Sequence, residues 1–284
     1  LINLKFLTVS FYKKIQENRP LIMGIINITP DSFYDGNHYN NFSLIKERIK
    51  QMVKEGVDII DFGAISSRPG SKDVTEDEEE ERLFPLFIKI KKEFPDLITS
   101  IDTYRSKIAE KAILCGANII NDIYAGRYDS NILSVVKRYN IPYIIMHMNG
   151  QPSNMQKDIN YKDFQYDILS FFEKKIKHIQ DMGHTQLILD PGFGFGKTIQ
   201  HNYQLVNMIP ELKKFGLPIL AGLSRKSMIS QVLKTNANGS LNGTSVLNSV
   251  CLMNGANIIR VHDVKEAKEA VKIIKKIKEN PFVK

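Results

Sequence analysis

Short runs of branched aliphatic residues recur along the chain, and a longer amphipathic segment separates most of them from the next. The runs show little polar alternation, which is typical of strands covered on both faces. We predict eight strands from these runs, over Leu21–Asn27, Asp58–Gly63, Ile98–Thr103, Ile119–Ile123, Pro142–His147, Leu187–Pro191, Ile219–Ser224 and Ile258–His262.

Between the runs, apolar residues recur three or four positions apart, as they do on one face of a helix. In the segment 43–55 this face carries Ile45, Ile49, Met52 and Val53. Further helices are predicted from Thr75 onward, where a Thr-x-x-Glu capping box opens an acidic segment, over Tyr161–Met182 and over Val264–Glu279.

Eight strands in series, each followed by a helix, are typical of an α/β protein with a (β/α)8 TIM barrel. A doubly wound open sheet also alternates strands and helices and is the competing fold. The count of eight and the length of 284 residues favour the barrel, because barrels of about 250 residues form one domain. We therefore expect one barrel domain over residues 20–284, preceded by an extension or cap over residues 1–19.

The composition excludes several classes of protein. Hydrophobic residues make up 43% of the chain and charged residues 25%, which is ordinary for a globular protein. No apolar stretch approaches the roughly 18 residues of a membrane helix, and the N-terminal residues lack the pattern of a secretory leader. Cys115 and Cys251 fall inside predicted helices, so we expect buried thiols in a reducing cytoplasm.

The net charge of +8 has three interpretations: a nucleic-acid partner, small anionic ligands, or a solvated lysine-rich surface. No basic run is interleaved with aromatic residues, so we expect no nucleic-acid partner. The lysines of the last predicted helix suit its outer face: Lys265, Lys268, Lys272, Lys275, Lys276 and Lys278.

Polar side chains stand at the carboxyl ends of nearly all the predicted strands. In barrels of this class the active site lies at that face, so we expect these side chains to form it. They are Asn27, Ser67 and Arg68, Asp102, Asn121 and Asp122, His147, Asp190, Lys226 and Ser227, and Arg260 and His262.

A glycine-rich run after the sixth predicted strand resembles two phosphate-binding motifs and fits neither. A Walker A loop would need glycine where Pro191 stands, and the third glycine of a dinucleotide fingerprint comes one residue early. His147, between two methionines, is not a convincing metal ligand, and we expect a structural role or a place beside the pocket.

Taken in order, the strand-end motifs resemble the dihydropteroate synthase family from about Leu21 to Val271. The matching segments are Met23–Phe33, Asp61–Gly63 with Ser67–Gly70, Ile101–Thr103, Asn121–Asp122, Met146–Met148, Asp190–Gly192 with Gly194–Phe195, Ser224–Lys226 and Arg260–His262. Together they are highly specific, although any one of them alone is weak.

The resemblance implies a transferase of folate biosynthesis. This family joins 4-aminobenzoate to a dihydropterin that carries a diphosphate, giving 7,8-dihydropteroate and pyrophosphate. The expected order is loss of pyrophosphate to a pterin cation, followed by attack of the amine. The resemblance also implies Mg²⁺, a homodimer and a target of sulfonamides.

Residue by residue, the resemblance assigns Asp102, Lys226 and Arg68 to catalysis, and Asp102, Asn121, Asp190 and Lys226 to the pterin. One carboxylate can accept both the ring N–H and the amino group of a pterin, which suits Asp190. A fixed carboxylate at Asp102 would stabilise a developing cation.

The remaining roles are implied in the same way. Arginine presents a planar fork to phosphate oxygens, and an anion favours the cationic form of a histidine. The pyrophosphate set is Asn27, Ser67, Arg68, Arg260 and His262; the aminobenzoate set is Phe33, Pro69, Phe195, Lys226 and Ser227; Mg²⁺ would lie at Asn27, with Asp35 a weaker candidate.

The sequence departs from the family pattern at Ala64, Ile65, Ser67 and Asn37, which affects loops rather than the pterin carboxylates. Two alternatives stay open. A methyltetrahydrofolate-dependent methyltransferase would also use Asp and Asn on a barrel but has no use for Arg68 and Arg260. A catalytically silent paralogue that binds pterin, within a complex, would not need the full polar set.

Overall fold

The fold is a parallel barrel, and the computed structural model describes it for residues 11–13, 15, 19–28, 38–65, 74–152, 154–157 and 159–281. All eight predicted strands are confirmed, with ends that differ from the prediction by at most three residues. They are β1 (Leu21–Asn27), β2 (Ile59–Gly63), β3 (Thr99–Asp102), β4 (Ile119–Asp122), β5 (Tyr143–Met146), β6 (Leu187–Asp190), β7 (Leu220–Ala221) and β8 (Ile258–Val261).

The strands pair in parallel in the order β6-β5-β4-β3-β2-β1-β8-β7. A parallel bridge between Leu189 and Ile219 then joins the two ends of this sheet, and the Leu189 N–H donates to Pro218 O at 2.8 Å. The sheet is therefore closed, and the open doubly wound alternative is wrong.

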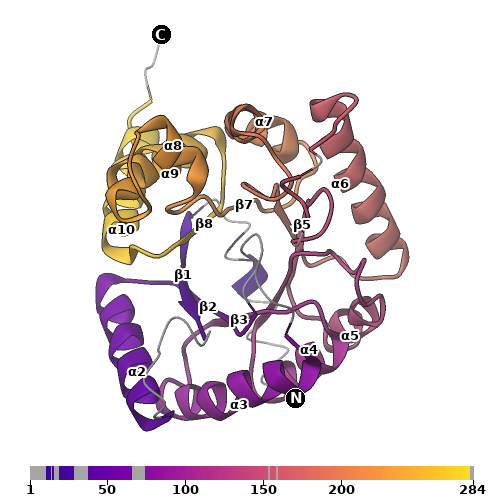
Figure 1. The fold of residues 1–284 in the computed structure, drawn as a ribbon, viewed down its shortest axis with the longest axis vertical. Coiled ribbons are helices and arrows are strands. Elements are labelled where there is room, and N and C mark those ends of the chain that lie inside the picture. The colour runs from indigo at the N-terminus through magenta and orange to yellow at the C-terminus, as the bar shows by residue number, and fades with distance from the viewer. Residues whose placement is uncertain are drawn as a thin grey trace.

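Helices surround the strands on the outside (Figure 1). Each covers the outer side chains of neighbouring strands, so the strands are apolar on that side too. The helices are α2 (His38–Glu55), α3 (Glu76–Glu93), α4 (Ser106–Leu114), α5 (Asn131–Tyr139), α6 (Phe164–Asp181), α7 (Ile199–Lys213), α8 (Ser227–Val232), α9 (Leu241–Asn254) and α10 (Val264–Glu279), with a 3-10 turn η2 (Asn238–Ser240).

The predicted helices are confirmed, although α2 begins five residues earlier and α6 three residues later than predicted, and one face assignment is wrong. Thr75 caps α3 as expected: its hydroxyl accepts from Glu78 N at 3.2 Å, and its own N–H donates to the Glu78 carboxylate at 2.9 Å. Val53, however, is 45% exposed, so its assignment to the inner face of α2 is wrong. It lies about 80° around the helix from Ile45, at the edge of the buried stripe.

The half of the barrel interior at the amino-terminal ends of the strands is apolar. Side chains from the first residues of the strands fill it, and the described part of the predicted cap packs against them through Phe11, Tyr12 and Ile15. The Tyr12 hydroxyl donates to Leu187 O at 2.8 Å. This segment closes the amino-terminal end of the barrel, which leaves the opposite end for chemistry.

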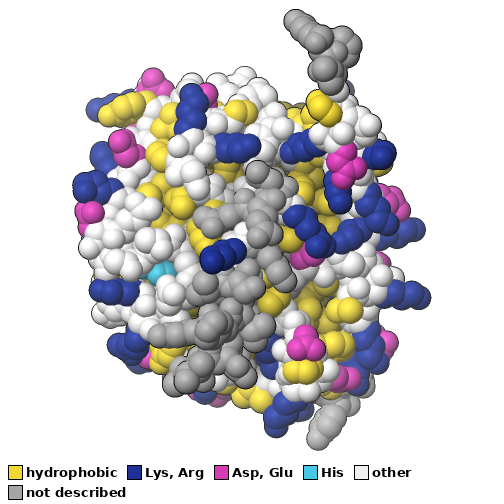
Figure 2. All heavy atoms as spheres, turned by 180° about the vertical axis from the view of Figure 1, so that it is seen from behind, with side chains coloured by type: hydrophobic (Ala, Val, Ile, Leu, Met, Phe, Trp, Pro, Cys, Tyr) yellow, Lys and Arg dark blue, Asp and Glu magenta, His cyan; other side chains and the backbone are white. Residues whose placement is uncertain are grey.

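The surface charge is dispersed. Figure 2 shows Lys and Arg side chains spread around the edge of one face, with Asp and Glu among them. The lysines predicted for the outer side of α10 are exposed, except that Lys268 is half-buried and donates to Gly56 O. No helix in the described ranges has the length and apolar character needed to cross a bilayer.

The two thiols differ in burial. Cys251 is buried in α9, as predicted. Cys115 directly follows α4 as its C-terminal cap and is only half-buried, so its placement inside a helix was wrong by one residue.

Candidate functional site

The strand register brings the predicted polar side chains into the upper barrel. Successive residues of a strand point to opposite faces. Side chains two positions further along each strand than the apolar residues that fill the amino-terminal half of the barrel therefore point inward as well. Pairing places Asn27, Gly63, Asp102 and Asn121 in one row across β1 to β4. Asp190 on β6 pairs in register with Met146 on β5, on the other side of the opening.

Arg260 is the centre of a polar cluster inside this opening. Its Nε donates to Asp61 Oδ2 at 2.7 Å, and its Nη2 donates to Asp102 Oδ2 at 3.2 Å. The Asn121 amide also donates to Asp61 Oδ2, at 3.2 Å. The Arg260 guanidinium on β8 thereby connects this strand to β2 and β3, neither of which is its neighbour in the sheet.

The charges in this cluster shift one another's pKa values. Burial and the neighbouring Asp61 raise the pKa of Asp102 to about 7, against the opposing effect of Arg260. Burial lowers the pKa of Arg260, but the carboxylates of Asp61 and Asp102 outweigh it and hold that pKa above its usual value. Asp102 is thus poised to change charge near neutral pH.

Asp190 and Lys226 form a second group of opposite charges. Asp190 is 7% exposed and accepts from Gly192 N at 2.8 Å. Burial raises the pKa of Asp190, and Lys226 is the main influence that opposes this rise. Burial likewise lowers the pKa of Lys226 to about 8, although Asp190 favours its charged form.

The Lys226 ammonium is fixed by the loop that follows β6. It donates to Phe193 O and lies over the Phe195 ring, 4.7 Å from the centroid. The predicted pair of Lys226 and Phe195 is thus brought together at the rim. Ser227 follows as the exposed first residue of α8.

The glycine-rich run packs against the end of β5, which explains its composition. A side chain at Gly192 would meet His147 O at 1.9 Å, and one at Gly196 would meet Asn149 O at 2.2 Å; both glycines have positive φ. Lys197 then lies buried beneath the loop and donates to Phe195 O at 3.0 Å and His147 O at 3.2 Å. These glycines serve close packing, in agreement with the rejection of both phosphate motifs.

His147 is a structural residue of this packing. It is buried, its Nδ1 lies 3.0 Å from Lys197 Nζ, and its ring contacts Phe171 edge-on. Burial and the nearby Lys197 lower the pKa of His147 well below its usual value. Among the described residues, no group of three or more His, Cys, Asp or Glu is arranged to hold a metal ion.

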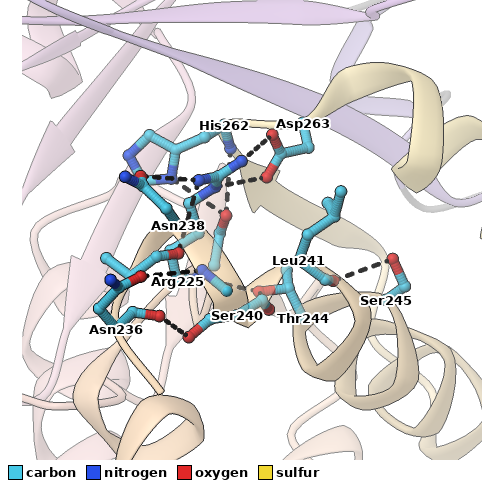
Figure 3. A network of polar contacts seen from close by, with 12 residues as sticks. Arg225, Asn236, Asn238, Ser240, Leu241, Thr244, Ser245, His262 and Asp263 are labelled. Atoms are coloured by element: carbon cyan, nitrogen blue, oxygen red, sulfur yellow. Dashed lines mark hydrogen bonds and ion pairs between the residues drawn. The ribbon is translucent and has the colours of Figure 1, made fainter.

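On the β7–β8 side, His262 and Ser224 lie in contact. Ser224 Oγ is 3.0 Å from His262 Nδ1 and accepts from His262 N at 3.2 Å. Arg225 and Asp263, the next residue of each segment, form a two-point ion pair (Figure 3). Arg260 and His262 therefore face different neighbours, with Arg260 inside the barrel and His262 at its rim.

Gly63 on β2 lies between Asn27 of β1 and Asp102 of β3 in the row of paired residues. A Cβ built there would lie 3.8 Å from Asn27 Oδ1 and 3.7 Å from Asp102 Oδ2. An amide oxygen and a carboxylate oxygen, with no side chain between them, are donors of the kind that hard cations such as Mg²⁺ prefer. These two oxygens are ligands of the type that would hold the ion implied by the sequence.

Several predicted residues lie outside the described ranges and cannot be placed. They are Phe33, Asp35, Asn37, Ser67, Arg68 and Pro69.

Sequence reasoning gave no role to three parts of this site: Asp61, Lys197 and the pair of Arg225 with Asp263. Asp61 carried a usable signal, because it is the one charged residue in the apolar run Ile59–Gly63, at an inward position. Lys197 and Arg225 stand inside recognisable motifs, but their partners are remote in sequence. Only the fold shows these contacts.

Together, a closed β/α barrel with a buried mixed-charge pocket at the carboxyl ends of its strands defines a barrel enzyme for a small polar ligand. Comparison with known proteins narrows this class. Residues 23–262 match the family described as pterin binding enzyme. The dihydropteroate synthase of Clostridium beijerinckii is 41% identical over 258 residues, which cover 90% of this chain and 93% of that protein.

Solved structures agree. A Yersinia pestis dihydropteroate synthase in complex with a sulfonamide drug matches with a TM-score of 0.86 and 40% identity, covering 92% of this chain and 95% of that one. Dihydropteroate synthase from Clostridium difficile, in the presence of pteroic acid, also has a TM-score of 0.86, with 39% identity and coverage of 92% and 98%. This chain therefore belongs to the dihydropteroate synthase family of pterin binding enzymes, which are transferases of folate biosynthesis.

Proposed function

We propose that this chain condenses (7,8-dihydropterin-6-yl)methyl diphosphate with 4-aminobenzoate to give 7,8-dihydropteroate and pyrophosphate. The observation that carries the proposal is the convergence of Asp102, Asn121, Asp190, Lys226 and Arg260 on one barrel opening. A relative was solved in the presence of pteroic acid, which joins a pterin to an aminobenzoate.

Asp190 and Asn121 bind the pterin. The buried carboxylate of Asp190 accepts the adjacent ring N–H and amino group, and the amide of Asn121 supplies a donor and an acceptor to the ring edge. Lys226 reaches the pterin carbonyl side from the rim, where its ammonium is held by Phe193 O and is close enough to Asp190 for that carboxylate to favour its charged form.

Asp102 stabilises charge during the reaction. When the C–O bond to the diphosphate breaks, its electron pair leaves with pyrophosphate and the pterin becomes a delocalised cation. A carboxylate fixed by Arg260 at 3.2 Å faces that cation without reorganising. The amine of 4-aminobenzoate then attacks the exocyclic carbon and loses a proton.

Arg260 and His262 supply positive charge and N–H donors to the departing pyrophosphate, together with Arg68, Ser67 and Asn27. The Arg260 guanidinium has more N–H groups than its two bonds to Asp61 and Asp102 use. Phe195 and Lys226 form a wall for 4-aminobenzoate, and Ser227, with Pro69 and Phe33, completes that subsite.

The same proposal includes Mg²⁺, held by Asn27, with Asp35 as a second candidate. When bound, the ion neutralises charge on the pyrophosphate oxygens. Asn27 Oδ1 and Asp102 Oδ2 lie 3.8 and 3.7 Å from a Cβ built at Gly63, and the proximity of two such oxygens supports this location.

The test is an assay for pyrophosphate with the purified chain. We expect release only when the dihydropterin diphosphate, 4-aminobenzoate and Mg²⁺ are all present, and a strong reduction after the metal is chelated. Methyl transfer from methyltetrahydrofolate would support the methyltransferase, and pterin binding without turnover would support the silent paralogue. Tight binding of 4-aminobenzoate to the bare enzyme would contradict the order of steps.

The pH profile is a further prediction. Catalysis requires ionised Asp102, with a pKa of about 7, and protonated Lys226, with a pKa of about 8. We therefore expect kcat/KM for the pterin diphosphate to rise with pH up to about 7 and to fall above about 8. A Glu110→Gln control, which changes the ion pair with Arg138 and the hydrogen bond from Tyr139 between α4 and α5, should give the same curve. A flat curve across neutral pH would contradict the assignment.

We also propose that the chain is a cytoplasmic homodimer, as its family suggests. The outer face of α9 exposes Val246, Val250 and Met253, which stand four and three positions apart on one side of the helix. A second copy covering this stripe would bury it. Analytical ultracentrifugation should give twice the mass of 32.5 kDa, and a Val250→Lys variant should shift the protein to monomer. A monomeric wild-type protein would refute the dimer.

A further inference from the structure

The ladder between β7 and β8 ends before the residues that carry the chemistry. Pairing covers only Leu220 with Ile258 and Ala221 with Ile259. Lys226 and Ser227 follow β7 by five and six residues, and they must act together with Arg260 and His262 of the neighbouring strand. Backbone pairing of β7 with β8 does not set the distance between these two segments.

Beyond the end of the ladder, side-chain contacts connect the segments that follow β7 and β8. Arg225 Nε donates to Asp263 Oδ2 at 2.8 Å, and Arg225 Nη2 donates to Asp263 Oδ1 at 2.7 Å. This fork-to-fork geometry is the strongest and most directional form of ion pair. Both side chains are largely shielded, with 25% and 17% of their surface exposed. The contact between Ser224 and His262 lies directly beside it.

Arg225 is also held in an unusual backbone conformation. Its φ is +56°, a left-handed value that a non-glycine residue adopts at a cost. The Arg225 N–H donates to Thr244 Oγ1 at 3.0 Å, and Thr244 in turn donates to Ser240 O at 2.8 Å. The segment around Ala237 and Asn238 completes the network, with oxygens 3.4 Å from Arg225 Nη1 (Figure 3).

We propose that Arg225 and Asp263 form a clasp that positions Lys226 and Ser227 relative to Arg260 and His262. The inference rests on the proposed function, because it assigns the first pair to the pterin and aminobenzoate and the second to pyrophosphate. Arg225 and Asp263 act through their neighbours and are positioning residues.

The decisive variant is Arg225→Gly. Glycine adopts a positive φ without cost, so it keeps the turn and the backbone bond to Thr244, while it removes the clasp and the weaker guanidinium contacts with Ala237 and Asn238. We expect kcat/KM to fall about 10- to 100-fold, because a displacement of about 1 Å at a reacting group can cost about 100-fold. Binding of free pterin should fall less than kcat/KM, because Asp190 and Asn121 stay in place and only Lys226 among the pterin residues is displaced. Unchanged kcat/KM in the folded variant would overturn the proposal.

A double-mutant cycle keeps the proposal testable if the glycine variant does not fold. Arg225→Gln and Asp263→Asn should each lower kcat/KM, and the double variant should be no worse than the poorer single, since both remove one contact. Multiplying losses would overturn the clasp. Arg225→Lys, which keeps the charge but not the fork, should recover only part of the activity.

Two controls separate this inference from the proposed function. Arg138→Gln breaks the pair with Glu110 between α5 and α4, and it should leave kcat/KM unchanged. If the wild-type chain makes no dihydropteroate from both substrates, the proposed function fails. If the wild type is active and Arg225→Gly is equally active, only the clasp fails.

Discussion

Replacing Asp190 with alanine is expected to abolish binding of the dihydropterin diphosphate. Two charge-assisted hydrogen bonds in a buried site are worth about 1.5–3 kcal/mol each, so the affinity should fall by at least about 100-fold. The side chain is 7% exposed, so in the alanine variant no carboxylate accepts the two pterin donors inside the barrel. Isothermal titration calorimetry with free pterin and with the diphosphate measures the loss.

Asp190→Asn sharpens this test. The amide is of the same size but offers only one acceptor oxygen, and its NH₂ group faces the donors of the pterin. We expect it to bind almost as poorly as the alanine variant. Thermal unfolding should show both variants folded, and retained micromolar affinity in either one would refute the role of Asp190.

Replacing Arg260 with methionine is expected to reduce both activity and stability. The side chain fills a similar volume but leaves Asp61 and Asp102 without the cation that lies 2.7 and 3.2 Å away. Breaking a buried pair typically costs about 3–5 kcal/mol, and loss of a donor to a developing anion about 100- to 1,000-fold in kcat.

The pH dependence of this variant identifies the cause. Arg260 lowers the pKa of Asp102, so its removal should raise that pKa above about 7. A carboxyl with a raised pKa in the folded state stabilises the fold below that pKa and loses this effect as pH rises. The deficit in Tm should therefore grow as pH rises above about 7, where the wild-type carboxyl is already ionised, and it should shrink as pH falls back to about 7. Arg138→Met, which breaks an exposed pair, serves as the control, and a deficit that does not change with pH would contradict the electrostatic explanation.

The strands could be predicted almost entirely from local pattern, because a strand covered on both faces is an uninterrupted apolar run. The boundaries of β7 were the least accurate: Ile219–Ser224 was predicted, and Leu220–Ala221 forms. Beyond Ala221 the chain follows the side-chain network around Arg225 instead of the ladder. The apolar character of the run Ile219–Ser224 alone does not indicate where its backbone pairing ends.

The motifs and the strand ends predicted which residues form the site. Asp102, Asn121, Asp190, Lys226 and Arg260 all reach one opening. Their pairing was not predictable, because Arg260 and Asp61 are 199 positions apart and only closure of the barrel brings them together. The same holds for Lys197, whose burial depends on how the glycines let one loop approach β5.

The bridge between Leu189 and Ile219 has a mechanical consequence. Seven junctions of the barrel are ladders, whereas within the described residues β6 and β7 meet through that isolated bridge. The junction with the least backbone pairing therefore lies between β6, the strand that bears Asp190, and β7, the strand that leads to Lys226. We expect a bulky ligand to widen the mouth of the barrel at this junction before it widens any of the laddered ones.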